Sequence, residues 1–138
     1  MLCARKLLPP AMTTVPIPNR QTILVADDER VIADTLKLIL SQHGFDAAVA
    51  YDGNSAIEMA RRFSPQLFLC DVIMPDINGV EVAIQVRAIL PECRVLLFSG
   101  QADVLDLLVL ARLRDYKFDV VVKPIHPSEL LARLRSLI

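Results

Sequence analysis

Five times in succession along this chain, a short apolar run is followed by a longer stretch whose apolar residues recur at helical spacing. The runs at 22–27, 45–51, 66–71, 93–99 and 118–122 are predicted to be strands, and the stretches at 29–43, 54–63, 80–90, 102–114 and 127–138 to be helices. Several strands are apolar continuously rather than alternately, which indicates that both of their faces are covered. The alternation therefore predicts an α/β fold, with a parallel sheet, helices on both faces and right-handed crossovers.

Glycine and proline mark where the predicted helices begin and end. Gly44 follows the first helix, where a left-handed residue commonly closes a helix. Pro65 and Pro91 end the second and third helices, because the residue before a proline disfavours helical backbone. The cap of the second helix is predicted at Asn54 or nearby, and Pro127 stands near the start of the last helix.

The length of 138 residues suits one domain with a substantial core, predicted at residues 21–138. Residues 1–20 contain four prolines and no periodicity, so they are predicted to form a flexible arm. Met12 opens the second part of this arm and is an alternative to Met1 as the natural start of translation. Of all residues, 54% are hydrophobic, which fits a sheet that is buried on both sides.

Charge and cysteine usage exclude several classes of protein. The formal net charge is −1, so no basic excess favours direct binding to nucleic acid. No apolar stretch is long enough to predict a membrane span. Cys3, Cys70 and Cys93 are odd in number and far apart, a usage typical of a reducing cytoplasm.

Polar residues stand where four of the predicted strands end. The first strand ends in Asp27 and Asp28, the third in Asp71, the fourth in Ser99 and the fifth in Lys123. In an open parallel sheet, ligands bind at the carboxyl ends of the strands, near the point where strand order reverses. We therefore expect these five side chains to converge on one crevice.

Three aspartates in one crevice would repel each other unless a cation lay among them. Mg²⁺ is the expected cation, because it prefers carboxylate oxygens and retains sites for water and phosphate. Lys123 and Ser99 could then neutralise and hydrogen-bond a phosphoryl group. Asp71 stands alone at a strand end, which makes it the best candidate for a nucleophile that forms an aspartyl phosphate.

The segments VADDE, LCDVIMPDINGVE, LLFSG and VVVKP together resemble the receiver domains of response regulators in two-component signalling, over residues 22–138. The resemblance implies a flavodoxin-like, doubly wound sheet of five strands in the order 2-1-3-4-5. It implies a stand-alone cytoplasmic signalling protein that receives a phosphoryl group from a histidine kinase or phosphotransfer protein. Such a protein catalyses only its own phosphorylation and dephosphorylation, and its output passes through contact with a downstream protein.

The resemblance also assigns roles to individual residues. Asp71 corresponds to the phosphoacceptor, and Asp27 and Asp28 to the acidic pair that holds Mg²⁺, with the backbone carbonyl of Ile73 as a further ligand. Ser99 and Lys123 correspond to the hydroxyl and the ammonium that bind the phosphoryl group.

Two further features of the sequence match the family. The bond between Lys123 and Pro124 corresponds to the family's usual cis peptide. Gly79 matches the loop after the phosphoacceptor, where it permits a tight turn into the third helix.

Two positions depart from the family pattern. Receivers usually carry an aromatic residue three positions before the conserved lysine, and that ring moves on phosphorylation, but here the position is Val120. Tyr116 and Phe118 are nearby, and Phe118 is expected on the same sheet face as Val120. The Gly-Ala that commonly precedes the fifth strand is absent as well, so the turn after the fourth helix is expected to differ in shape.

The fourth helix carries more apolar residues than one core-facing stripe requires. One interpretation is a wide buried face, and the other is an exposed patch at Leu107 or its neighbours that binds a partner or a second copy. Asp119 and Arg133 occupy positions where dimerising receivers place an ion pair between subunits. A homodimer through the fourth helix, fifth strand and fifth helix is therefore one hypothesis.

Other interpretations compete with these. Asp28 alone could be an ordinary helix cap, and Asp76 and Asn78 are predicted to be turn formers. A pseudo-receiver would keep the fold as an adaptor without phosphorylation. A small aspartyl-phosphate phosphohydrolase would need a second acid two residues after the nucleophile, where this chain has Ile73. His43 and His126 are predicted to face solvent and are assigned no function.

Overall fold

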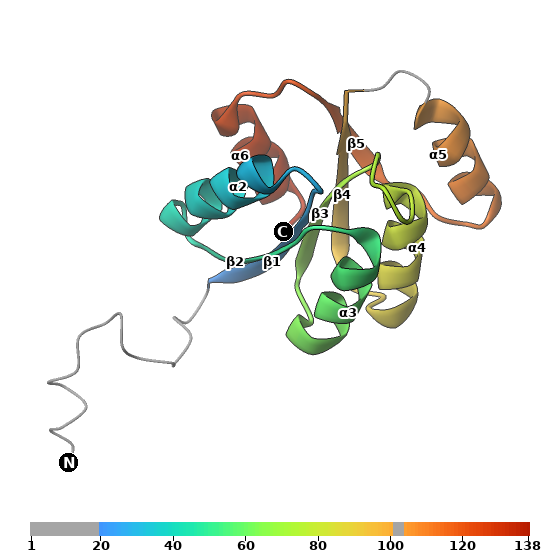
Figure 1. Cartoon of the computed structure of the whole chain (residues 1–138), viewed down its shortest axis with the longest axis horizontal. Coiled ribbons are helices and arrows are strands. Elements are labelled where there is room, and N and C mark those ends of the chain that lie inside the picture. The colour runs from blue at the N-terminus through green and yellow to red at the C-terminus, as the bar shows by residue number, and fades with distance from the viewer. Residues whose placement is uncertain (1–19, 101–103) are drawn as a thin grey trace, which may run out of the picture.

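A computed structural model describes residues 20–100 and 104–138 of the chain (Figure 1). Five strands alternate with five helices in the described residues. In chain order they are β1 (Gln21–Ala26), α2 (Arg30–Gln42), β2 (Phe45–Ala50), α3 (Gly53–Phe63), β3 (Leu67–Asp71), α4 (Gly79–Ile89), β4 (Arg94–Ser99), α5 (Val104–Leu113), β5 (Asp119–Val122) and α6 (Pro127–Ser136). In these residues no helix is long and apolar enough to cross a membrane.

The strands form one parallel sheet in the order β2-β1-β3-β4-β5, which confirms the predicted class and strand order. β1 pairs with β2 on one side and with β3 on the other, so the direction of winding reverses between β1 and β3. Side chains at the carboxyl ends of β1 and β3 therefore lie at the topological switch point, where ligands bind in open α/β sheets.

Each face of the sheet carries its own hydrophobic core. On one face, α3, α4 and α5 pack over residues such as Leu24, Phe68 and Leu97. On the other face, α2 and α6 pack over residues such as Ile23 and Phe98 (Figure 1). Successive strand residues alternate between the two cores, which is why the strands are apolar without interruption.

The observed boundaries differ from the predicted ones by one or two residues at most ends. The second predicted helix begins at Gly53, and its cap is Asp52, whose side chain accepts a hydrogen bond from Ser55 N at 2.7 Å. Phe118 lies just before β5 rather than within it. The last helix ends at Ser136 because its final carbonyls are closed by short-range hydrogen bonds from residues 137 and 138.

Two of the sequence predictions include residues outside the described ranges. The arm predicted at 1–20 is described only at Arg20, and the first two residues of the helix predicted at 102–114 are not described. Cys3 and Met12 also lie outside the described residues.

Three described residues with positive φ lie at helix ends or in the turns that follow, and one of them is Ser64, the C-cap of α3, with a φ of +47°. Gly44 follows α2 with a φ of +93°, as predicted for a residue that closes a helix. Asp115, in the turn after α5, has a φ of +67°, a conformation that aspartate tolerates better than most residues. The turn before β5 therefore has its own left-handed residue in place of glycine.

Gly79 lies where the loop after β3 folds back on the end of that strand. Its amide donates to the Val72 carbonyl at 2.6 Å, and a Cβ at this position would overlap the Asp71 carbonyl oxygen. Only glycine leaves room for this approach, so Gly79 fixes the start of α4 against the end of β3.

We therefore predict that Gly79→Ala destabilises the protein by about 2 kcal/mol, because overpacking against rigid backbone outweighs the gain in helix propensity. Gly100→Ala is the matched control, since its Cβ would meet only the Lys123 Cβ, at 3.8 Å. It should change stability by less than about 0.5 kcal/mol. Urea unfolding measures both, and equal effects would contradict the account of Gly79.

Candidate functional site

Four strand ends bring the predicted site residues to one edge of the sheet. Asp27 and Asp28 directly follow β1, and Asp71 is the last residue of β3. Ser99 is the last residue of β4, and Lys123 follows β5, where its amide donates to the Ser99 carbonyl at 2.9 Å. The parallel register explains why residues almost a hundred positions apart lie together.

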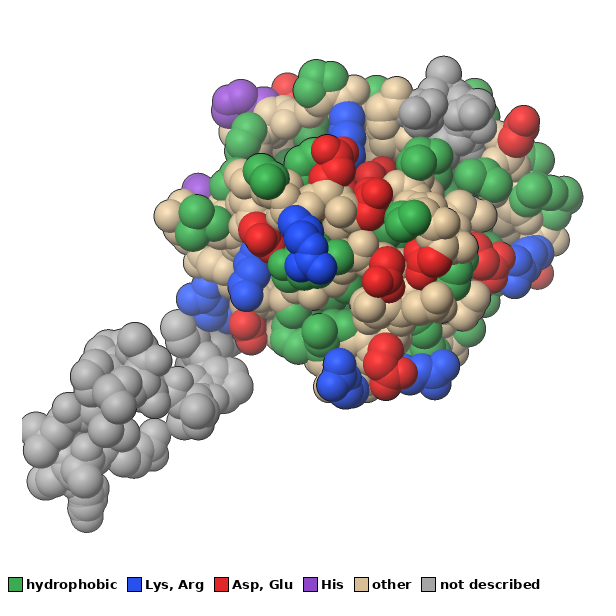
Figure 2. Space-filling view, in the orientation of Figure 1, with side chains coloured by type: hydrophobic (Ala, Val, Ile, Leu, Met, Phe, Trp, Pro, Cys, Tyr) green, Lys and Arg blue, Asp and Glu red, His purple; other side chains and the backbone are tan. Residues whose placement is uncertain are grey.

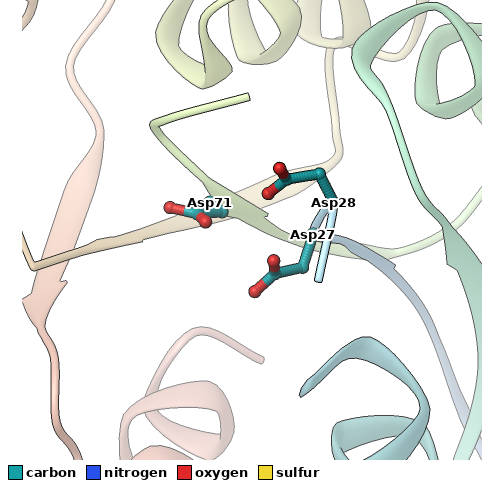
Figure 3. Close-up of side chains that lie close together, drawn as sticks. All are labelled: Asp27, Asp28 and Asp71. Carbon is teal, nitrogen blue, oxygen red and sulfur yellow. The ribbon is translucent and has the colours of Figure 1, made fainter. Parts of the chain in front are cut away.

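The three aspartates form a compact acidic cluster. One carboxylate oxygen from each lies within 4.8 Å of the others, and Figure 3 shows the carboxyl groups extending toward the same side of the strand ends. Asp27 is 0% exposed and Asp71 is 6% exposed, whereas Asp28 is open to solvent. The cluster is therefore buried at Asp27 and Asp71 and accessible to solvent at Asp28. Figure 2 shows acidic side chains on the surface of the molecule that faces the viewer.

Lys123 bridges the two buried carboxylates. Its Nζ lies 3.3 Å from Asp71 Oδ2 and 3.5 Å from Asp27 Oδ2. The ammonium also lies 4.6 Å from the centre of the Phe98 ring, so a cation–π contact holds it from the side. Sequence reasoning did not single out Phe98, although its place beside Ser99 on β4 was a usable signal.

Backbone amides fix the other oxygens of the buried aspartates. Asp27 Oδ1 accepts a hydrogen bond from Glu29 N at 2.9 Å, and Asp71 Oδ1 accepts one from Ile73 N at 3.3 Å. The residue at the N-cap position of α2 is Glu29, so Asp28 is not the helix cap. The carboxylate of Asp28 remains available to a ligand at the solvent-exposed side of the cluster.

Burial raises the pKa of Asp71, and the charge of Asp27 raises it further, although Lys123 partly opposes both. The neighbouring thiol of Cys70 is fully buried, and burial together with the charges of Asp71 and Asp27 raises its pKa well above the ordinary range. Cys70 is therefore a protonated packing residue at neutral pH and not a nucleophile.

The donor set fits a hard divalent cation. Three carboxylates supply oxygen ligands, and Asp27 Oδ2 is buried without a hydrogen-bond donor among the described residues, leaving Lys123 as its charged partner. Mg²⁺ accepts such a set while keeping several waters, and Asp28 offers access from solvent. Ile73 donates its amide to Asp71 Oδ1, and its carbonyl stays a predicted ligand.

Ser99 and Val120 lie on the neighbouring strands. Ser99 is 2% exposed at the end of β4, and its place at this edge fits the predicted contact with a phosphoryl group. Val120 lies opposite Leu97 and packs against the same core as Phe118, as expected for residues on one sheet face. The ring of Phe118 stacks on Tyr116 with centroids 5.9 Å apart, so this aromatic pair precedes β5.

The outer surface of α5 carries several exposed apolar side chains beside the charged residues Asp106 and Arg112. Leu107 is half-buried against the core, whereas four of its neighbours on the helix are exposed, namely Leu105, Val109, Leu110 and Leu113. Leu113 is 76% exposed, and Val122 on β5 is exposed as well. Asp119 and Arg133 both face solvent. The predicted patch therefore consists of the neighbours of Leu107 more than of Leu107 itself.

Three helix caps near this edge involve residues that the sequence predicted to be turn formers or assigned nothing. Asn78 accepts from Glu81 N at 2.9 Å at the start of α4, and exposed His126 accepts from Ser128 N at 3.1 Å at the start of α6. Asp76 accepts from Gly53 N and Asn54 N, which begin α3. Its partners lie more than twenty residues earlier, so no local pattern in the sequence could reveal them.

Comparison with known proteins places this chain in a family. The family model of the response regulator receiver domain matches residues 23–135, nearly the whole chain. The chain therefore belongs to the response regulator receiver domain family. Proteins of this family act in two-component signalling, where an aspartate accepts a phosphoryl group and Mg²⁺ binds at an acidic pocket.

Curated relatives share more than a third of their aligned residues with this chain. It is 37% identical over 117 residues to the DNA-binding response regulator MtrA of Mycolicibacterium smegmatis, covering 85% of this chain and 50% of that protein. It is 36% identical over 120 residues to the transcriptional regulatory protein CreB of Escherichia coli, covering 87% and 52%. The chain thus spans about half the length of the curated relatives it matches.

Solved structures support the fold. A CheY-like response regulator receiver domain protein from Methanospirillum hungatei superposes with a TM-score of 0.78 at 25% identity, over 84% of this chain and 91% of that one. The response regulator protein TrrA from Thermotoga maritima, solved in complex with Mg²⁺-BeF, gives a TM-score of 0.72 at 28% identity, over 86% and 99%.

The raised pKa of Asp71 makes a prediction about stability and pH. Below about pH 3.8, the ordinary pKa of an aspartate, the acid is neutral in both folded and unfolded protein, so Asp71→Asn should change little. As the pH rises through the raised pKa, the folded wild type loses stability relative to Asp71→Asn. At neutral pH without Mg²⁺, we expect the variant to be more stable by on the order of 1 kcal/mol.

Thermal unfolding at pH 3, 5 and 7 measures this difference. Added Mg²⁺ should stabilise the wild type and reduce the advantage of the variant, because a ligand that binds only the folded state raises its stability. An Asp71→Asn variant less stable than the wild type at pH 7 without Mg²⁺ would contradict the electrostatic account.

Proposed function

We propose that this chain is a phosphoacceptor response regulator whose Asp71 receives a phosphoryl group from a phosphohistidine on a histidine kinase or phosphotransfer protein. The observation that carries the proposal is the position of Asp71. It ends the central strand β3 among two other carboxylates, and its Oδ2 lies 3.3 Å from Lys123 Nζ. The carboxylate of Asp71 therefore lies between the other two carboxylates of the cluster, which could hold a cation, and the ammonium of Lys123.

In the proposed reaction, an oxygen of ionised Asp71 attacks phosphorus as the bond from phosphorus to the histidine nitrogen breaks, and the nitrogen keeps the electron pair. Asp27, Asp28 and the Ile73 carbonyl would hold Mg²⁺, which neutralises charge on the phosphoryl oxygens when bound. Lys123 and Ser99 bind the transferred group on its other side. The same residues would later permit hydrolysis of the aspartyl phosphate.

The surface beside the cluster supports approach of a protein donor. A cavity of 270 Å³ lies next to Lys123, lined mainly by apolar side chains of α2, β3, β4 and the segment leading to α6, including Ile32, Leu36 and Ile125. Val31 at the start of α2 is exposed. A partner that presents a phosphohistidine to Asp71 would cover this apolar rim, and no direct contact with nucleic acid or membrane is proposed.

We place the output surface on α5 and its neighbours. Leu105, Val109, Leu110 and Leu113 are exposed on α5 and Val122 is exposed on β5, and these apolar side chains are the proposed contact for a downstream protein or a second copy of the chain. In a homodimer through α5, β5 and α6, Asp119 and Arg133 would pair between subunits. The protein would act in the cytoplasm, where two-component signalling converts a stimulus into such contacts.

The first experiment is phosphorylation by a small donor. Incubation with acetyl phosphate and Mg²⁺ should add the mass of one phosphoryl group to the wild type and none to Asp71→Asn. Asp46→Asn is the matched control, because Asp46 is an exposed aspartate on β2, outside the cluster. It should be phosphorylated like the wild type, and removing Mg²⁺ with a chelator should prevent the adduct.

The outcome distinguishes the competing functions. A wild type that takes no phosphoryl group would support a pseudo-receiver, and a persistent adduct in Asp71→Asn would exclude Asp71 as the acceptor. Rapid turnover of added phosphate esters without a lasting adduct would support a phosphohydrolase. Each of the three results contradicts the proposal.

The patch on α5 gives a second prediction. Leu113→Glu should weaken self-association or binding to a partner by about tenfold or more, because it places a charge in an apolar contact. Leu38→Glu is the control, since Leu38 is 59% exposed on α2, on the other face of the sheet. Analytical ultracentrifugation with and without phosphorylation measures the effect. Equal behaviour of the two variants would contradict the patch as an interface.

A further inference from the structure

Asp76 binds the first two amides of a helix that belongs to a different part of the chain. Its Oδ1 accepts a hydrogen bond from Gly53 N and its Oδ2 one from Asn54 N, both at 2.8 Å. Helices leave their first amides without internal partners, so a carboxylate there is stabilised by hydrogen bonds and by the helix dipole. Asp52 satisfies a third amide, that of Ser55, from within the same helix end.

The contact keeps Asp76 charged. Burial alone would raise the pKa of this carboxyl, but the hydrogen bonds from the Asn54 and Gly53 amides outweigh it and hold the pKa below its usual range. Both oxygens are therefore engaged as acceptors at neutral pH. The link between the loop and the helix is a charge-assisted pair of bonds, stronger than neutral ones.

The start of α3 is closely packed against the rest of the molecule. Gly53 is buried, and a Cβ at this position would lie 2.9 Å from Val82 Cγ2 and 3.2 Å from Ile77 Cβ. Close packing of this kind leaves little freedom for movement. Asp76 thus ties the loop that follows β3 to a rigid part of the molecule.

That loop carries the proposed metal ligand. It begins at Val72, whose amide donates to the Phe98 carbonyl at 3.1 Å, and it ends where Gly79 N donates to the Val72 carbonyl. Ile73, Pro75 and Asp76 between these anchors are exposed. Asp76 therefore holds the outer part of a loop whose two ends are already fixed at the sheet.

We infer that Asp76 is a positioning residue for the metal site, which holds the loop so that the Ile73 carbonyl faces the acidic cluster. It touches neither the metal nor the phosphoryl group and acts only through the backbone of residues 73–76. Groups outside the first ligand shell commonly change metal affinity by tenfold or more when removed. The readout through Mg²⁺ rests on the function proposed above.

Asp52 provides a matched control. Asp52→Ala and Asp76→Ala each remove one carboxylate cap from the same helix end, but only Asp76 belongs to the loop. Both variants should lower the melting temperature. Asp76→Ala should also raise the Mg²⁺ concentration for half-maximal phosphorylation by acetyl phosphate roughly tenfold. Asp52→Ala should leave that concentration within about twofold of the wild type.

Amide hydrogen exchange gives a second readout that does not depend on phosphorylation. Exchange at residues 73–79 should accelerate in Asp76→Ala and stay unchanged in Asp52→Ala. Asp76→Asn, whose amide oxygen can keep one of the two hydrogen bonds, should lie between wild type and Asp76→Ala, and it replaces Asp76→Ala if that variant does not fold.

The two hypotheses fail in different ways. If the wild type takes no phosphoryl group, the proposed function fails, and the exchange comparison alone decides the role of Asp76. If Asp76→Ala and Asp52→Ala behave alike in both readouts, Asp76 is an ordinary helix cap and the inference is overturned.

Discussion

The fold holds three carboxylates so that one oxygen of each lies within 4.8 Å of the others, and their mutual repulsion governs what this edge of the sheet can bind. Two of them are buried, and the described charge that compensates them is one ammonium, Lys123, at 3.3 Å and 3.5 Å. Burial raises the pKa of Asp71 and the charge of Asp27 raises it further, while the single ammonium of Lys123 opposes both without cancelling them. The cluster is therefore poised to bind a cation, which is the condition that phosphoryl chemistry at Asp71 needs.

The fold brings the three carboxylates together without disturbing the packing of the hydrophobic cores. Both faces of the sheet are covered by continuous apolar packing, and the aspartates stand only where the strands end. Gly79 lets the loop after β3 return to the strand end without displacing Asp71. The residues that form the site therefore follow the apolar residues that stabilise the fold along each strand. The site can carry unfavourable charge while the hydrophobic cores remain intact.

Much of this arrangement could be predicted from the sequence. Continuous apolar runs predicted doubly covered parallel strands, and such strands place their carboxyl ends at one edge, so Asp27, Asp71 and Lys123 had to lie together. The strand order came from the family resemblance and is confirmed. The cis peptide between Lys123 and Pro124, also implied by the resemblance, is confirmed as well.

Other features depend on contacts that no local pattern encodes. The hydrogen bonds of Asp76 reach a helix more than twenty residues earlier. Periodicity could not decide which leucines of α5 are exposed, because apolar residues occur all around that helix, and Leu107 packs against the core beside α4 residues such as Val80 and Ile84. The cap predicted at Asn54 or nearby is Asp52, two residues earlier, and the sequence could not choose between them because both are good capping residues.

In the proposed reaction Asp71, and no other carboxylate of the cluster, accepts the phosphoryl group. Borohydride reduces an aspartyl phosphate to homoserine, so reduction of the phosphorylated protein followed by peptide mass spectrometry locates the acceptor. We expect homoserine at position 71 and intact aspartates at positions 27 and 28. Homoserine at Asp27 or Asp28, or at a position outside the cluster, would contradict it.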